Sequence, residues 1–240
     1  MISRLAAALL VVIAAAPARA QTSTPDPNAA FLADVEKVKA HFLVSQELYA
    51  AGQAGPAGVH AAHPVHEIGE RVVRPIRQAA GPEAAERART LLKQPGRTLS
   101  SKPLAAAYRD AVTQASAGLD DLGNRVVPAR TRDSVPFRAR VIALVLDGFL
   151  DEYDEAIKGG KITQPIEYGD AWAFLQRATA RYREIAERVT ARAPATARAI
   201  EADFAALARG FPGITPPTTP LSLDEAKTLT KRLREALATL

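Results

Sequence analysis

The 240-residue chain contains no cysteine, and its single methionine is Met1. Without cysteine the chain forms no disulfide, offers no thiolate ligand and lacks the attachment motif of c-type haem. Cu(I) sites and iron–sulfur clusters depend on soft sulfur ligands, so both kinds of centre are excluded. The fold is therefore expected to be held by packing, without covalent cross-links.

Aromatic residues are also scarce, at 5% of the chain, although 48% of its residues are hydrophobic. Much of that content is alanine, which like leucine, arginine and glutamate favours helix. No segment combines strict apolar–polar alternation with β-branched residues, which is the signal of a strand. The sequence predicts an all-α fold, an up-and-down bundle of about seven or eight helices.

After the N-terminal segment, no stretch of the chain reaches the ~18 consecutive apolar residues of a membrane span. Residues 1–20 combine a basic start, an apolar run and the sequence Ala18-Arg19-Ala20. This pattern is typical of a cleavable export signal, the alternative being an uncleaved anchor helix. We expect cleavage after Ala20 and a soluble periplasmic protein.

The chain carries no strong excess of one charge. Its formal net charge is +5, and loss of Arg4 and Arg19 with the leader leaves 29 Lys and Arg against 26 Asp and Glu, or +3. Nucleic-acid binding needs basic residues clustered on one face, so nucleic acid is not an expected partner. The expected partners are a metal ion or small cofactor, and a periplasmic protein.

Glycine and proline divide the rest of the chain into segments. After a flexible terminus at 21–28, helices are expected at about 29–52, 56–80, 82–94, 103–122, 136–158, 165–190 and 194–209. Residues 211–220 are rich in proline and predict a stiff linker. In the last segment, 221–240, Ser222 and Glu225 form a capping box that predicts a helix start. The expected organisation is one helical domain, 29–210, with an appended C-terminal helix.

All four histidines lie between residues 40 and 70, at positions 41, 60, 63 and 66. Imidazole is the commonest metal ligand in proteins, and it titrates near neutral pH. His60, His63 and Glu67 are spaced i, i+3 and i+7, which places them on one face of a helix. This concentration of imidazole and carboxylate predicts a metal site.

The remaining candidate ligands follow from the expected helix geometry. The short turn at 52–56 makes two successive helices antiparallel neighbours, and the rise per residue places His63 nearest to His41. We therefore predict a cross-helix pair of His41 and His63, flanked by His60 and Glu67. The peripheral candidates are His66 and Glu167.

Two further carboxylates, Asp170 and Asp147, lie on expected helices. Asp170 follows Glu167 within the stretch 158–175, which looks like a second motif without an assigned chemistry. Asp147 shares a stripe with Arg140 and other charged residues, which favours a solvated face for it. Imidazole and carboxylate suit Fe, Zn, Cu(II) or Mn. The expected cofactor is a divalent transition metal (Fe, Zn or Cu(II)), with haem held by histidine as the alternative.

A different interpretation follows from the apolar residues of the same helix. Ala61, Val65 and Ile68 define the face opposite the histidines, which would turn the histidines toward solvent. In that case the protein is a non-catalytic structural or interaction protein without a metal. The sequence also lacks HExxH, a nucleophile elbow and a phosphate-binding loop, so a metal hydrolase ranks below a binding role.

The histidine stretch reads G-x-H-x-x-H-P-x-x-E, with Gly58, His60, His63, Pro64 and Glu67 at the named positions. It resembles the imelysin and EfeO-type periplasmic proteins of iron uptake, which carry G-x-H-x-x-E or H-x-x-E on an all-helical fold. This chain departs from that element because a second histidine, and not glutamate, follows His60 by three residues. The resemblance implies a helical protein associated with iron uptake.

Overall fold

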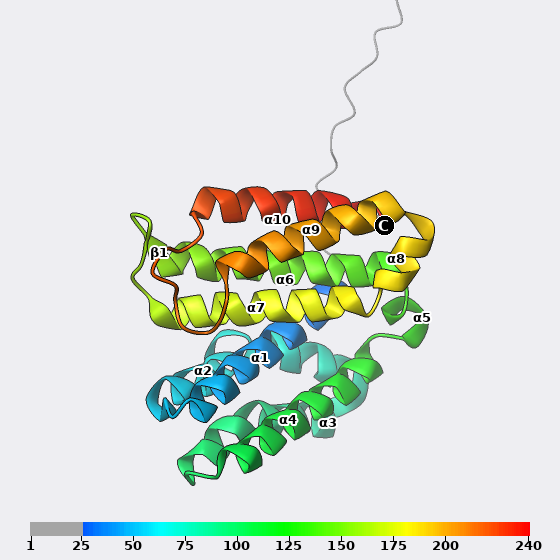
Figure 1. The fold of residues 1–240 in the computed structure, drawn as a ribbon. Helices are drawn as coiled ribbons and strands as arrows, with labels where there is room; N and C mark the ends of the chain where they lie inside the picture. The colour runs from blue at the N-terminus through cyan, green and yellow to red at the C-terminus, as the bar shows by residue number, and fades with distance from the viewer. Residues whose placement is uncertain (1–25) are drawn as a thin grey trace, which may run out of the picture.

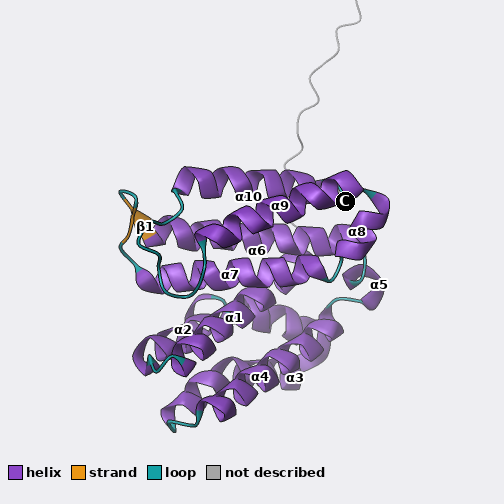
Figure 2. Cartoon of the chain, viewed as in Figure 1, coloured by secondary structure: helices purple, strands orange, loops and turns teal. Residues whose placement is uncertain are grey.

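The computed structural model describes residues 26–240 and confirms the all-α fold (Figures 1 and 2). The helices in this part of the chain are α1 (Pro27–Ala50), α2 (Ala54–Glu67), α3 (Gly69–Ser100), α4 (Ala105–Val126), α5 (Ala129–Arg132), α6 (Val135–Ala156), α7 (Pro165–Arg183), α8 (Ala186–Arg192), α9 (Pro194–Gly210) and α10 (Leu223–Ala238). A two-residue antiparallel hairpin, β1 (Ile157–Lys158) and β2 (Lys161–Ile162), joins α6 to α7.

The helices form two groups that meet along α1 and α7. Figure 1 shows α6, α7, α9 and α10 side by side in one group, with α1, α2, α3 and α4 in the other. Helix α1 packs on α2 and α4 of its own group and also on α6 and α7 of the other. One continuous hydrophobic core runs through both groups. Side chains on α1 and α7 therefore lie where the two groups meet.

The structure has more helices than expected because several predicted segments are divided. The segment expected at 56–80 breaks at Ile68, after Glu67, and Pro64 lies inside α2 without ending it. The segment expected at 165–190 divides into α7 and α8. The range of α3 contains the break expected at 81–82, because Gly81 has non-helical backbone angles (φ +87°, ψ 178°) that suit glycine, and Pro82 begins its second part.

Helix α10 is an integral part of its group. It begins as the capping box predicts, since the Ser222 hydroxyl accepts a hydrogen bond of 3.2 Å from the backbone N–H of Glu225. Its apolar face is buried, with Leu233 fully inaccessible, and it packs on α6 and α9. Burial of this face explains why the helix lies against the bundle.

The predicted linker at 211–220 is attached to the same group through aromatic side chains. Phe211 is buried, and its ring centroid lies 5.0 Å from that of Phe149, 4.7 Å from Tyr153 and 5.4 Å from Tyr168. The Tyr153 hydroxyl donates to the carbonyl of Leu221. The few aromatic residues of the chain thus fix the irregular segment that leads into α10.

A buried ion-pair network joins the two groups near the middle of α1. Glu36 is 3% exposed and accepts hydrogen bonds from Arg177 (2.6 Å from Nη2) and from Arg181, both on α7. Lys39 lies 3.4 Å from Glu36 and 2.7 Å from Asp120 on α4. Three helices are therefore connected through paired charges, as buried ions require.

Candidate metal centre

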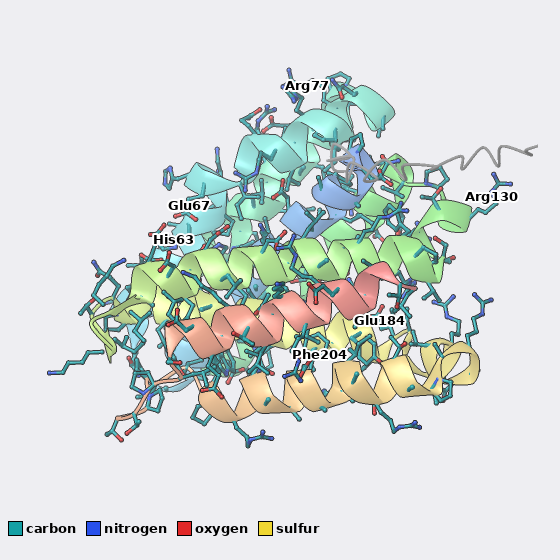
Figure 3. All side chains as sticks on the ribbon, turned by 90° about the horizontal axis from the view of Figure 1, so that it is seen from above. His63, Glu67, Arg77, Arg130, Glu184 and Phe204 are labelled. Atoms are coloured by element: carbon teal, nitrogen blue, oxygen red, sulfur yellow. The ribbon has the colours of Figure 1, made fainter. Side chains whose placement is uncertain are left out.

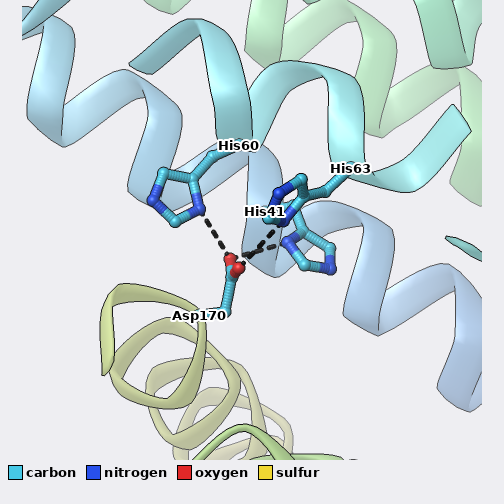
Figure 4. Close-up of side chains that lie close together, drawn as sticks. All are labelled: His41, His60, His63 and Asp170. Atoms are coloured by element: carbon cyan, nitrogen blue, oxygen red, sulfur yellow. Dashed lines mark hydrogen bonds and ion pairs between the residues drawn. The ribbon is translucent and has the colours of Figure 1, made fainter. Parts of the chain in front are cut away.

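Three of the four histidines and one aspartate converge where the two helix groups meet (Figure 4). His41 comes from α1, His60 and His63 from α2, and Asp170 from α7. The carboxylate Oδ1 of Asp170 lies 2.6 Å from His41 Nδ1 and 2.8 Å from His60 Nδ1, and its Oδ2 lies 3.1 Å from His63 Nδ1. Each of these residues offers one potential ligand atom, and the four atoms lie within 4.8 Å of one another.

Burial distinguishes this cluster from a solvated polar stripe. His41 and His60 are 0% and 1% exposed, and Asp170 is fully buried. Ala61, on the predicted apolar face, is 1% exposed as well, so α2 is covered on both sides. The interpretation that the face with His60 and His63 turns to solvent is therefore wrong, because α1 and α7 cover it.

A glycine next to Asp170 permits the close approach of α7. A Cβ atom added to Gly169 would lie 3.1 Å from Val44 and 3.4 Å from the His60 ring. The missing side chain leaves room for the imidazole beside the helix backbone. This local feature helps to place the Asp170 carboxylate among the three histidines.

Further carboxylates surround the histidines. Glu67, at the end of α2, has a half-exposed side chain and lies 3.7 Å from His63 Nδ1 and 3.8 Å from His41 Nε2. Glu152 of α6 and Glu167 of α7 form a second group with Asp170, again with ligand atoms within 4.8 Å of one another. Four carboxylates therefore lie close to three imidazoles.

Of the predicted candidates, only His66 lies outside the cluster. His66 is exposed, although it follows His63 by one helical turn. His41 and His63, predicted as a cross-helix pair, have ring centroids 5.5 Å apart. Asp147 instead pairs with Arg234 of α10 at 3.1 Å. The residues predicted to flank the pair, His60 and Glu67, are both beside it.

The carboxylates of the cluster differ strongly in their electrostatics. Burial opposes ionisation of Asp170, but His41, His60 and His63 outweigh it and hold the Asp170 pKa well below its usual range. Burial raises the pKa of Glu152 to about 9, and the negative charges of Asp170 and the neighbouring glutamates add to this rise. A cluster this rich in carboxylates suits a positively charged ligand.

One fully buried nitrogen of the cluster has no hydrogen-bond partner. His41 Nε2 is buried, while the Nδ1 atom of the same ring is engaged by Asp170. Buried polar atoms are nearly always paired, so an orphaned imidazole nitrogen calls for an explanation. Its free lone pair is a suitable metal ligand once Nδ1 carries the proton. The residues present therefore fit a metal ion by ligand type, spacing and burial.

Sequence reasoning missed the centre of the cluster and one of its carboxylates. In the sequence Asp170 stands out only as a neighbour of Glu167, although its i, i+3 spacing from Glu167 is a usable signal. Glu152 had no such signal, because it follows a strongly apolar stretch of α6 and stands among other acidic residues. Its place in the cluster depends on how α6 packs on α7.

Comparison with known proteins gives one match. Residues 128–240 match the family model described as the iron permease-associated 4-helix bundle domain. This range includes α6, α7, α9 and α10, which are the helices of one group. No curated protein and no solved structure matches the chain.

The predicted periplasmic location is wrong in the light of this match. The matched domain is associated with an iron permease, and a permease is a membrane protein.

Among residues 26–240, none of the helices is long and apolar enough to cross a membrane. The predicted export signal at 1–20 and most of the predicted flexible terminus lie outside the described residues. Asp26 accepts a hydrogen bond from the Asn28 N–H and caps α1.

The matched range supplies Glu152, Glu167 and Asp170, whereas the histidines precede it. Two separate parts of the chain therefore contribute to the cluster, and each has its own likeness to known proteins. The histidine stretch resembles the imelysin and EfeO-type proteins. The match of residues 128–240 to the iron permease-associated 4-helix bundle domain links the chain to the helical proteins of iron uptake.

Proposed function

We propose that His41, His60, His63 and Asp170 bind a transition-metal ion, and that the chain serves iron uptake as a metal-binding partner of a permease. The observation that carries this proposal is the buried convergence of three imidazoles on one carboxylate, with His41 Nε2 left unpaired. The link of residues 128–240 to an iron permease-associated domain supports iron as the ion.

The ligand chemistry favours a single ion over haem at this position. Three imidazoles and a carboxylate match the ligand preferences of Fe, Zn, Cu(II) and Mn. All four residues offer ligand atoms within 4.8 Å of one another, which suits one coordination sphere. A haem would instead use an imidazole as an axial ligand on one side of its ring plane. Helices from both groups would then have to separate to admit it.

The exposure of the ligands suggests how an ion enters and leaves. His41, His60 and Asp170 are buried, His63 has a side-chain exposure of 19%, and Glu67 reaches 49%. This gradient leads from solvent past Glu67 and His63 to the buried ligands. Figure 3 shows His63 and Glu67 beside each other, away from Glu184 near the far end of α7. We propose that Glu67 is the first ligand that an incoming ion meets.

Metal-dependent stabilisation tests the proposed function. Thermal melting at pH 7.5 with Fe(II) under anaerobic conditions, and with Zn(II) or Mn(II), is expected to raise the melting temperature of the wild type. Ligand at 100 times its Kd stabilises a native protein by about 2.7 kcal/mol. His63→Ala is expected to lose most of this gain, because it removes a ligand from the cluster.

His66→Ala is the matched control for that experiment. It makes the same substitution on the same helix, but at an exposed position outside the cluster. It is expected to keep the full metal-dependent rise. A wild type that no metal stabilises would overturn the proposed function. Equal losses in both variants would contradict the assignment of His63 as a ligand.

Metal affinity is also expected to fall on acidification. The hydrogen bond to Asp170 raises the pKa of His63 above its ordinary 6.5, and burial opposes this only in part. A proton and a metal ion compete for the same imidazole, so weakening should begin at a pH higher than 6.5. Zn(II) titrations between pH 8 and pH 5.5 measure this effect. A metal affinity that does not change across that pH range would refute the involvement of imidazole.

A further inference from the structure

We infer that the cluster holds a second cation beside the first, bound by the carboxylates of Glu67, Glu152 and Glu167 and sharing Asp170 with the histidine site. This inference rests on the proposed function and extends it from one ion to two. Asp170 belongs to both groups of potential ligands, one formed with the three histidines and the other with Glu152 and Glu167.

The geometry of Asp170 suits a bridging carboxylate. Its Oδ1 atom faces His41 and His60 at 2.6 and 2.8 Å, while Oδ2 lies 3.1 Å from His63. The second group of ligand atoms, from Glu152 and Glu167, lies within 4.8 Å of Asp170. Two ions bound to one carboxylate typically lie about 3.5–4 Å apart. The two ligand groups overlap closely enough for such a pair.

The unpartnered nitrogen of His41 connects the histidine group to the neighbouring carboxylates. His41 Nδ1 is directed at Asp170, whereas Nε2 is buried, unpaired and 3.8 Å from a carboxylate oxygen of Glu67. One imidazole thus presents its two nitrogens to two different carboxylates. A neutral imidazole has one lone pair, and with the Nδ1 proton donated to Asp170 this pair is on Nε2, beside Glu67. The ligand atoms therefore extend from the histidines toward the carboxylates.

The charge of the cluster favours the same conclusion. A bound cation favours the ionised form of nearby carboxylates, and Glu67, Glu152, Glu167 and Asp170 then carry one negative charge each. A single divalent ion offsets half of this charge, and a second divalent ion offsets the rest. Oxygen-only ligand sets suit hard cations such as Mn(II), whereas imidazole accepts a wider range of metals. The two positions therefore differ in ligand chemistry as well as in place.

The number of bound ions tests this inference directly. Equilibrium dialysis of the full chain against Mn(II), followed by metal analysis, is expected to give about two ions per wild-type chain. Glu152→Gln keeps the shape of the side chain but removes its charge, and is expected to bind one. Electron paramagnetic resonance should show a spin-coupled Mn(II) pair in the wild type and an isolated ion in the variant.

Two more variants complete the experiment. Glu167→Gln is expected to reproduce the loss of one ion, and circular dichroism checks that both variants fold. Asp151→Asn changes the exposed residue next to Glu152 on α6 and is expected to retain two ions. One ion in the wild type, or two ions in both glutamine variants, would overturn the second cation while leaving the first. No bound ion in the wild type would instead refute the proposed function.

Discussion

Replacing Asp170 with asparagine is expected to lower metal affinity by more than about 100-fold. Mutation of a residue that only orients a metal ligand already lowers metal affinity by about 10–100-fold. Asp170 contacts His41, His60 and His63, and it is fully buried. Asparagine removes the negative charge and replaces one oxygen with an NH₂ group. That group cannot bind a cation, and it opposes any imidazole N–H directed at it.

The measurement is a Zn(II) or Mn(II) titration of the wild type and Asp170→Asn, with melting curves without metal to check folding. Asp147→Asn is the matched control, because Asp147 is a partly exposed carboxylate that pairs with Arg234 outside the cluster. It is expected to keep wild-type affinity. An unchanged Kd in a folded Asp170→Asn protein would show that the ion, if any, binds elsewhere.

Replacing Glu36 with glutamine is expected to lower the free energy of unfolding by about 3 kcal/mol, at the lower end of values for breaking a buried ion pair. Burial opposes the charge of Glu36, but Arg177, Lys39 and Arg181 outweigh it and lower its pKa from 4.5 to about 2. That difference in pKa corresponds to about 3 kcal/mol at neutral pH. Glutamine leaves the cationic partners without their buried counter-charge.

The contribution of Glu36 should also disappear in acid. Because its pKa is lower in the folded state, its stabilisation is complete above pH 4.5 and is lost as pH falls toward about 2. Urea unfolding at pH 7, 4.5, 3 and 2 should therefore show the wild type and Glu36→Gln converging. A difference in unfolding free energy between the two proteins that stays the same at every pH would contradict this account.

Glu184→Gln provides the control for the network. Glu184 pairs with Arg181 at 2.7 Å, but its side chain is 41% exposed. Exposed ion pairs contribute about 0–1 kcal/mol, so this variant should remain close to the wild type. The contrast separates a buried charge from a surface charge that shares the same arginine.

The histidine–Asp170 cluster and the Glu36 ion-pair network both connect α1 with α7. Glu36 and His41 both lie on α1, while Arg177 and Asp170 both lie on α7. The ion pairs of Glu36 with Arg177 and Arg181 connect α1 and α7 at positions separate from the histidine cluster. A metal site requires ligand positions fixed to within fractions of an ångström. The network therefore supports the geometry in which His41 meets Asp170.

Local sequence patterns were sufficient for the helical fold. Composition and the spacing of glycine and proline predicted helices throughout, and the Ser222 capping box predicted the start of α10. The same local information placed His60 and His63 one turn apart, and the short turn before α2 placed them beside α1. The histidine motif also gave the correct link to iron uptake. Each of these inferences depends on residues that are neighbours in the chain.

Tertiary structure decided what surrounds the histidines. Amphipathic periodicity identifies an apolar face, but it does not reveal whether the opposite, polar face is covered by another helix. Here α7 covers it, and Asp170 reaches His63 across 107 residues and His41 across 129. Glu152 joins through the packing of α6 on α7. The carboxylates were visible in the sequence, but only the contact between the two helix groups brings them to the imidazoles.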